Sequence, residues 1–270
     1  MLILIQFVLR LAFGMAAAMT LVSPRQVTSG YYRNNLYVLL GLNVLVTLAV
    51  GTAGATSLSI WLPVSAAVVS YLGAACWLYE RPTPGMAALG FVAVADLVAA
   101  WLAVPPVIDA AQSSLADSAT GLAEGGVTAA AGLIAWLDPP TGGLVLGSTM
   151  AAMLLGHWYL NAPGMALAPL RRLIALMLVA VVLRALVCGW GLEEELTSVG
   201  APGKIGWALF VGVRWLAGLL ATALLAVMSW QTLKIPNTQS ATGILYVAVI
   251  TTFLGELASG LLSAEASYPL

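Results

Sequence analysis

Five charged residues lie inside long apolar stretches of the sequence, namely Arg10, Asp96, Arg184, Arg214 and Glu256. A charge at the centre of a membrane helix costs about 2.5–3.5 kcal/mol on insertion scales, so such residues face the bundle interior and pair. Depth counted at about 1.5 Å per residue puts Arg10 and Asp96 near the midplane and predicts an ion pair between them. The same count places Arg184, Arg214 and Glu256 together in the outer half.

The intramembrane charges do not cancel, because three arginines stand against two carboxylates. The surplus guanidinium must meet water, a backbone carbonyl, a lipid phosphate or a bound polar ligand, and its planar fork of donors suits that role. One interpretation is a ligand-binding or proton-relay site formed by Arg184, Arg214 and Glu256. The other is an ion-pair network that fixes the register of the helices, and the sequence leaves both open.

His157 is the only histidine, and it lies near one end of an apolar stretch, just before Trp158 and Tyr159. Imidazole titrates close to neutral pH, so His157 is a candidate catalytic proton donor or acceptor for a quinone oxygen. The alternative is a hydrogen-bonded structural residue. A haem held by two histidines of this chain alone is excluded. We also predict no metal site, since no cysteine or carboxylate lies at ligand spacing around His157.

The chain that carries these residues is strongly apolar. Its 270 residues are 61% hydrophobic and 8% charged, whereas a soluble domain carries about 25% charged residues. The formal net charge of -1 excludes a nucleic-acid partner, which needs a basic face. The two cysteines, Cys76 and Cys188, show neither metal-type spacing nor a disulfide framework. We therefore expect an all-α, polytopic integral membrane helical bundle whose partner is the lipid bilayer.

Eight segments are apolar over the length of about 20 residues that a spanning helix needs. They are 2–23, 36–58, 59–79, 86–107, 143–162, 170–192, 206–230 and 240–263. Only Thr56, Ser57 and Ser59 separate the second segment from the third, so seven helices are an alternative. The first segment has no basic region before it and contains Arg10, which favours a retained helix over a cleaved signal peptide.

Loop charges predict the orientation and favour eight helices. With eight, one set of loops contains Arg25, Arg33, Arg81, Arg171, Arg172 and Lys234. The opposite loops contain seven acidic residues, with Lys204 as their one base: Asp109, Asp117, Glu124, Asp138, Glu193, Glu194 and Glu195. Basic loops stay in the cytoplasm, so both termini should lie on the outer, non-cytoplasmic side.

The domain organisation follows from these spans. We expect a single transmembrane domain, 1–270, with four helices in 1–107 and four in 143–270. The long outer connection, 108–142, contains an apolar stretch too short to span, which predicts a short amphipathic or re-entrant segment. Three helix ends on the basic side repeat a tryptophan with a proline five or six residues later: Trp77 and Pro82, Trp158 and Pro163, and Trp230 and Pro236. A duplicated helical hairpin is one interpretation; interfacial anchors followed by helix breakers is the favoured one, because the copies are unequally spaced.

These features predict an integral membrane subunit of a respiratory or other redox, electron-transfer complex, in a bacterial cytoplasmic (inner) membrane. Its expected ligand is a quinone or a bound lipid, with proton transfer through the intramembrane charges. Other membrane or redox subunits would then be its partners, and the chain would be a quinone-binding or non-catalytic subunit more than a self-contained enzyme. Eight-helix quinone-reactive anchors share the helix count, which is an analogy of architecture only.

Two other functions stay open at this stage. The first is a secondary transporter or channel, although such proteins usually have helices broken near the midplane. Here the prolines and glycines that interrupt apolar stretches lie mostly at their ends. The second is a non-catalytic membrane scaffold that packs against partners or lipids.

Overall fold

The computed structural model describes residues 1–52, 57–103, 124–162, 164–198, 205–235, 237–264, 266, 268 and 270. All regular structure in these residues is helical, and eight of the helices are long and apolar enough to cross a membrane. The all-α, eight-helix expectation is confirmed, as befits an integral membrane protein. The seven-helix alternative is wrong, because α2 (Ser29–Thr52) and α3 (Ser57–Leu78) are separate helices.

The first half of the chain is a ring of four helices. In it α1 (Leu2–Thr20) packs on α2, α2 on α3, α3 on α4 (Pro82–Leu102), and α4 again on α1. Glu80 closes the tight α3–α4 turn in the left-handed backbone region, with φ of 53°. Pro82 then opens α4, where its missing amide hydrogen is not needed. Near this turn, Trp77 of α3 stacks on Tyr32 of α2, with ring centroids 4.1 Å apart.

The second half repeats this plan. In it α6 (Glu124–Asn161) packs on α7 (Ala168–Ser198) and on α10 (Thr238–Ser263). The remaining span is divided into α8 (Ile205–Gly212), the π-helix η1 (Val213–Ala221) and α9 (Thr222–Thr232). It packs against both α7 and α10, which closes the second ring.

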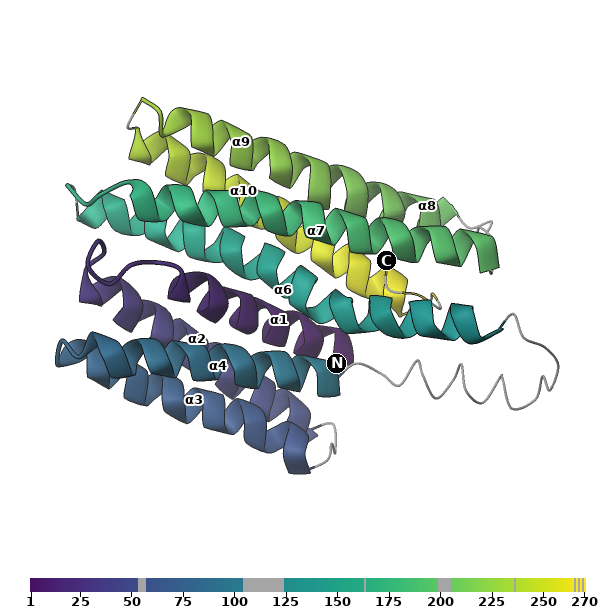
Figure 1. Cartoon of the computed structure of the whole chain (residues 1–270), viewed down its shortest axis with the longest axis horizontal. Coiled ribbons are helices and arrows are strands. Elements are labelled where there is room, and N and C mark those ends of the chain that lie inside the picture. The colour runs from purple at the N-terminus through teal and green to yellow at the C-terminus, as the bar shows by residue number, and fades with distance from the viewer. Residues whose placement is uncertain are drawn as a thin grey trace.

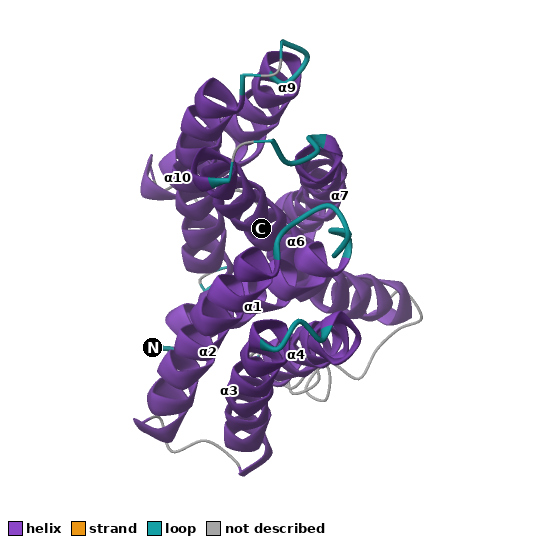
Figure 2. Cartoon of the chain, turned by 90° about the vertical axis from the view of Figure 1, so that its left-hand side faces the viewer, coloured by secondary structure: helices purple, strands orange, loops and turns teal. Residues whose placement is uncertain are grey.

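The two rings meet along α1 and α6, which lie side by side at the centre of the molecule (Figure 2). Gly14 of α1 lies directly against Gly143 and Gly147 of α6, so closely that a Cβ at Gly14 would overlap the Gly143 carbonyl. Small residues let membrane helices approach in this way without a hydrophobic driving force between them. This seam fixes the position of Arg10 on α1 relative to α6.

α6 begins earlier than the sequence suggested. Its helix is continuous from Glu124, with Pro139 and Pro140 inside it, whereas we expected a connection up to residue 142 and a span from 143. Pro140 has no amide hydrogen for the Trp136 carbonyl, four residues back. The indole of Trp101 donates to that carbonyl instead, at 3.0 Å, and the two tryptophan rings stack. The rest of the expected connection, 108–123, lies outside the described residues.

Both chain ends lie toward the right-hand end of the bundle in Figure 1, while the α1–α2, α3–α4 and α9–α10 connections lie at the left-hand end. An even number of spans requires this arrangement. Large apolar side chains are exposed along most helices, among them Leu48, Trp61, Val94, Leu186 and Leu224. Such a surface is suited to contact with lipid acyl chains.

Candidate functional site

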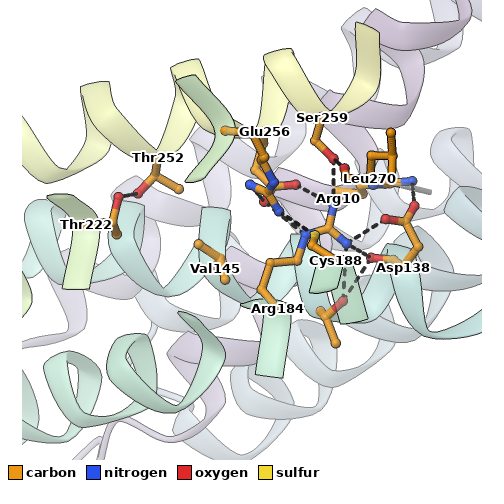
Figure 3. A network of polar contacts seen from close by, with 12 residues as sticks. Arg10, Asp138, Val145, Arg184, Cys188, Thr222, Thr252, Glu256, Ser259 and Leu270 are labelled. Carbon is orange, nitrogen blue, oxygen red and sulfur yellow. Dashed lines mark hydrogen bonds and ion pairs between the residues drawn. The ribbon is translucent and has the colours of Figure 1, made fainter. Parts of the chain in front are cut away.

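A chain of five alternating charges crosses the interior of the second ring and reaches α1. In order, it contains Arg10 of α1, Asp138 of α6, Arg184 of α7, Glu256 of α10 and Arg214 of η1. Figure 3 labels Arg10, Asp138, Arg184 and Glu256. Each neighbouring pair forms a salt bridge. One helix from the first ring and all four spans of the second ring therefore contribute to a single buried network, which we call the charge chain.

Arg184 is the centre of the charge chain, and it is fully buried. Its Nη1 donates to Asp138 Oδ1 at 2.5 Å, while its Nε and Nη2 donate to the two oxygens of Glu256, both at 3.1 Å. Nη2 also reaches Ser259 Oγ at 3.1 Å. A guanidinium with this two-pronged carboxylate contact is held in one orientation. Arg184 is thus fully satisfied by the protein.

Asp138 is the member of the charge chain that the sequence analysis missed. We assigned it to the outer connection, but it lies within α6 and is buried, with Arg10 and Arg184 on either side. Two prolines, Pro139 and Pro140, follow it directly within the helix. Thr141, one turn later, also faces Arg184, with Oγ1 at 3.4 Å from Nη1. The available signal in the sequence was the spacing of these two polar residues, Asp138 and Thr141, three positions apart on one helix face.

Gly142 makes room for the charge chain. A Cβ at this position would lie 2.8 Å from Glu256 Oε2, 3.3 Å from Arg184 Cζ and 3.4 Å from Arg10 Nη1. The missing side chain lets three charged groups from three other helices converge on α6. Sequence reasoning did not single out this glycine, because its role depends on neighbours that are remote in sequence.

Arg214 is the surplus cation. It is 1% exposed; its Nη1 donates to Glu256 Oε1 at 2.8 Å and its Nη2 to the thiol of Cys188 at 3.0 Å. A thiol is a weak acceptor, and Nε of Arg214 is buried with no hydrogen-bond partner among the described residues. The structure therefore brings Arg184, Arg214 and Glu256 together, as the depth count suggested, and leaves one of the two arginines partly unsatisfied.

The backbone that carries Arg214 is a π-helix, η1. π-helical segments are rare and occur frequently at functional sites. Gly218, one turn after Arg214, touches the backbone of Gly255 on α10, where a Cβ at Gly218 would lie 2.6 Å from the Gly255 Cα. This close approach sets Arg214 beside Glu256.

The expected ion pair between Arg10 and Asp96 is not formed. Arg10 turns toward Asp138, and its Nε donates to Gln6 Oε1 at 3.1 Å. Asp96 faces the interior of the first ring, where its Oδ2 accepts from Asn43 Nδ2 at 3.3 Å. The helices α1 and α4 are neighbours, but the Arg10 side chain points to Asp138 and the Asp96 side chain to Asn43.

His157 lies apart from the charge chain. Its Nδ1 is 3.1 Å from the hydroxyl of Tyr246 on α10, and both side chains are exposed. Along α6 it is 19 residues from Asp138, about 28 Å at the usual helical rise. The structure therefore places the predicted proton-active histidine at the other end of the bundle from Arg214.

No group of three metal-ligating side chains occurs in the part of the chain that the structure describes. Cys76 and Cys188 are both free thiols. Comparison of the chain with protein-family models, with curated proteins and with solved structures finds no match.

Proposed function

We propose that this chain is an integral membrane subunit of a redox complex, in which Arg214 binds the polar head of a quinone and the charge chain takes part in proton transfer. The observation that carries the proposal is the buried Nε–H of Arg214, which has no acceptor among the described residues. A quinone carbonyl oxygen is a suitable acceptor, and hydrogen bonds from a charged donor are the stronger kind.

The position of Arg214 suits a ligand that arrives from the lipid. The span that contains it is the least buried of the eight, and its Val213, Leu216 and Leu220 are exposed. A ligand dissolved in the hydrocarbon would approach laterally, past this span, and would displace only the weak Arg214–Cys188 contact. A water-soluble anion has no such route through apolar side chains.

The carboxylates would serve the proton side of the reaction. Reduction of a quinone to a quinol takes up two electrons and two protons; a redox centre in a partner subunit would supply the electrons. Glu256 lies next to Arg214 and would be the carboxylate that exchanges a proton with the bound quinone. Arg184 stays charged and would hold Glu256 and Asp138 in place without carrying a proton itself. His157 would act separately, as a proton donor or acceptor at the opposite end.

Two matched variants test the quinone proposal. Arg214→Leu should lose bound quinone while the fold survives, because Glu256 keeps Arg184 as its partner. Arg184→Leu should lower the melting temperature strongly, because it removes the partner that Asp138 and Glu256 share. The measurement is quinone content by mass spectrometry, beside thermal melting, for protein purified gently from membranes. Quinone retained in Arg214→Leu, or absent from the unmodified protein, would contradict the proposal.

The π-helix η1 favours a secondary transporter as the second candidate. Transporters place irregular helix segments at their binding sites, and η1 interrupts the seventh span beside the charge chain. In this case the purified chain alone, in proteoliposomes, should move protons or a small solute across the bilayer. A redox subunit would instead co-purify with partner subunits and show no flux by itself.

A further inference from the structure

The two rings are related by an approximate half-turn about an axis between α1 and α6. Figure 2 shows α2 and α7 on opposite sides of that central pair, and α3 and α9 at opposite ends of the molecule. The neighbours also correspond, because the first helix of each ring packs on the second and the fourth, and the third on the second and the fourth. Even the weaker contacts across the seam match, with α1 on α10 and α4 on α6.

Each ring has a polar contact to a buried carboxyl group across its diagonal, from its second helix to its fourth. In the second ring Arg184 of α7 donates to Glu256 of α10. In the first ring Asn43 of α2 donates to Asp96 of α4. Both carboxyl groups lie about two turns before the end of the fourth helix. Asn43–Asp96 therefore occupies the position in the first ring that Arg184–Glu256 occupies in the second.

The two sites differ in charge. Glu256 has two guanidinium partners, whereas the one described partner of Asp96 is a neutral amide. Asp96 is fully buried, and neither its Oδ1 nor the Oδ1 of Asn43 has a hydrogen-bond partner among the described residues. Two acceptor oxygens without a donor in an apolar interior are unfavourable, and an ionised carboxylate without a cation is more so.

We propose that Asp96, held by Asn43 in the interior of the first ring, is a proton-binding site equivalent in position to Glu256. A proton on the carboxyl group removes its charge and supplies the donor that the two free oxygens lack. The inference goes beyond the redox role proposed above and does not depend on it, since it concerns a different ring and different residues.

The surroundings favour a proton over a metal cation. Of the helices packed on α4, α1 has one charged residue, Arg10, which is engaged by Asp138, and α3 has none within Ser57–Leu78. On α6, Asp138 is held by Arg10 and Arg184. The titratable groups of α3 are Tyr71, which is exposed, and Cys76, near its end. A sodium or potassium ion prefers several oxygen ligands, and the Asn43 amide presents its N–H to Asp96.

Infrared spectroscopy of the full-length protein with isotopically labelled aspartate tests this proposal. At neutral pH the unmodified protein should show the carbonyl stretch of a protonated aspartic acid. That band should vanish in Asp96→Asn and remain in Glu256→Gln, the control at the equivalent site. Asp96→Asn should also melt near the unmodified protein, because a neutral amide replaces a neutral acid, while Glu256→Gln should melt far lower.

The double variant Asn43→Asp with Asp96→Asn exchanges the two residues and should restore the band. It provides the test if Asp96→Asn alone fails to fold. A protein without the band at neutral pH would overturn the proposal. So would a melting temperature that sodium or potassium chloride raises in the unmodified protein but not in Asp96→Asn, since the site would then hold a metal cation.

Discussion

Arg184 and Arg214 share one carboxylate but differ in what else they contact. Arg184 directs its donors at Asp138, Glu256, Ser259 and Thr141, whereas Arg214 has Glu256 and a thiol. A buried charge is tolerated when all of its hydrogen-bond donors have partners. Removing one partner of a buried ion pair lowers the stability of the fold far more than replacing the whole pair by apolar residues. Arg184 therefore fits a structural role, and Arg214 fits a role in binding.

Glu256→Gln should destabilise the protein strongly. The substitution removes the shared counter-charge of two buried arginines, and breaking buried pairs of this kind costs about 3–5 kcal/mol in soluble proteins. Thermal melting in detergent measures it, with the exposed Glu193→Gln as the control that should melt like the unmodified protein. Equal melting of both variants would show that Glu256 does not hold the charge chain together.

Gly142→Ala should disturb the charge chain without changing any charge. The new methyl group would press on Glu256 and Arg184, and overpacking of this kind costs about 1–3 kcal/mol. Gly132→Ala is the matched control on the same helix, since a Cβ there meets nothing within 4 Å and alanine favours a helix by up to about 1 kcal/mol. Gly142→Ala should melt below the unmodified protein and Gly132→Ala at or above it; the reverse order would contradict the packing described here.

At the scale of the element, the π-helix η1 changes the direction in which the Arg214 side chain points. A π-helical turn contains an additional residue compared with an α-helical turn, so the face that Arg214 presents differs from the one a regular helix would give it. The hydroxyl of Thr222, at the start of α9, then contacts Thr251 and Thr252 of α10 at 3.0 and 3.1 Å. These contacts and the Gly218–Gly255 approach hold the seventh span on α10 within η1 and directly after it.

Gly218→Ala should separate η1 from α10 and weaken the Arg214–Glu256 contact. The new Cβ would meet backbone atoms, which cannot rotate away. We expect a lower melting temperature and a loss of whatever ligand Arg214 binds. Gly212→Ala, in the same span but with open space around its Cβ, should change neither quantity. A Gly218→Ala variant that behaves like Gly212→Ala would mean that this close approach is not needed.

Counting residues along the spans grouped three of the charged residues, but it wrongly set Arg10 apart from them and did not predict the direction in which the side chains point. Depth depends only on counting residues along a span, and it grouped Arg184, Arg214 and Glu256, which the structure joins. Direction depends on how the helices rotate against one another, so Arg10 was assigned to Asp96 although it faces Asp138. The eight spans were predictable from apolar length and loop charge. The start of α6 was not, because a tryptophan indole on another helix satisfies the carbonyl that a proline leaves free.

At the scale of the whole molecule, both ends of the chain lie at one end of the bundle and the arginine-containing connections at the other. Since basic loops stay in the cytoplasm, we propose that both termini lie outside. Single cysteines in a background with Cys76 and Cys188 replaced by alanine test this. Ser23→Cys, in the α1–α2 connection, should be labelled only from the cytoplasmic side, and Thr197→Cys, at the end of α7, only from outside. Labelling of both from the same side would contradict this topology.

The salt bridge between Arg10 and Asp138 joins residues that are 128 positions apart in the chain. During synthesis at about 5–20 residues per second, Arg10 would be made roughly 6 to 26 seconds before its counter-charge. Until then the first helix contains an unpaired guanidinium and should rest near the headgroups or in the insertion machinery. The first ring would therefore reach its final position only after α6 has been made. Packing of α1 against α6 would be the assembly step that joins the two rings.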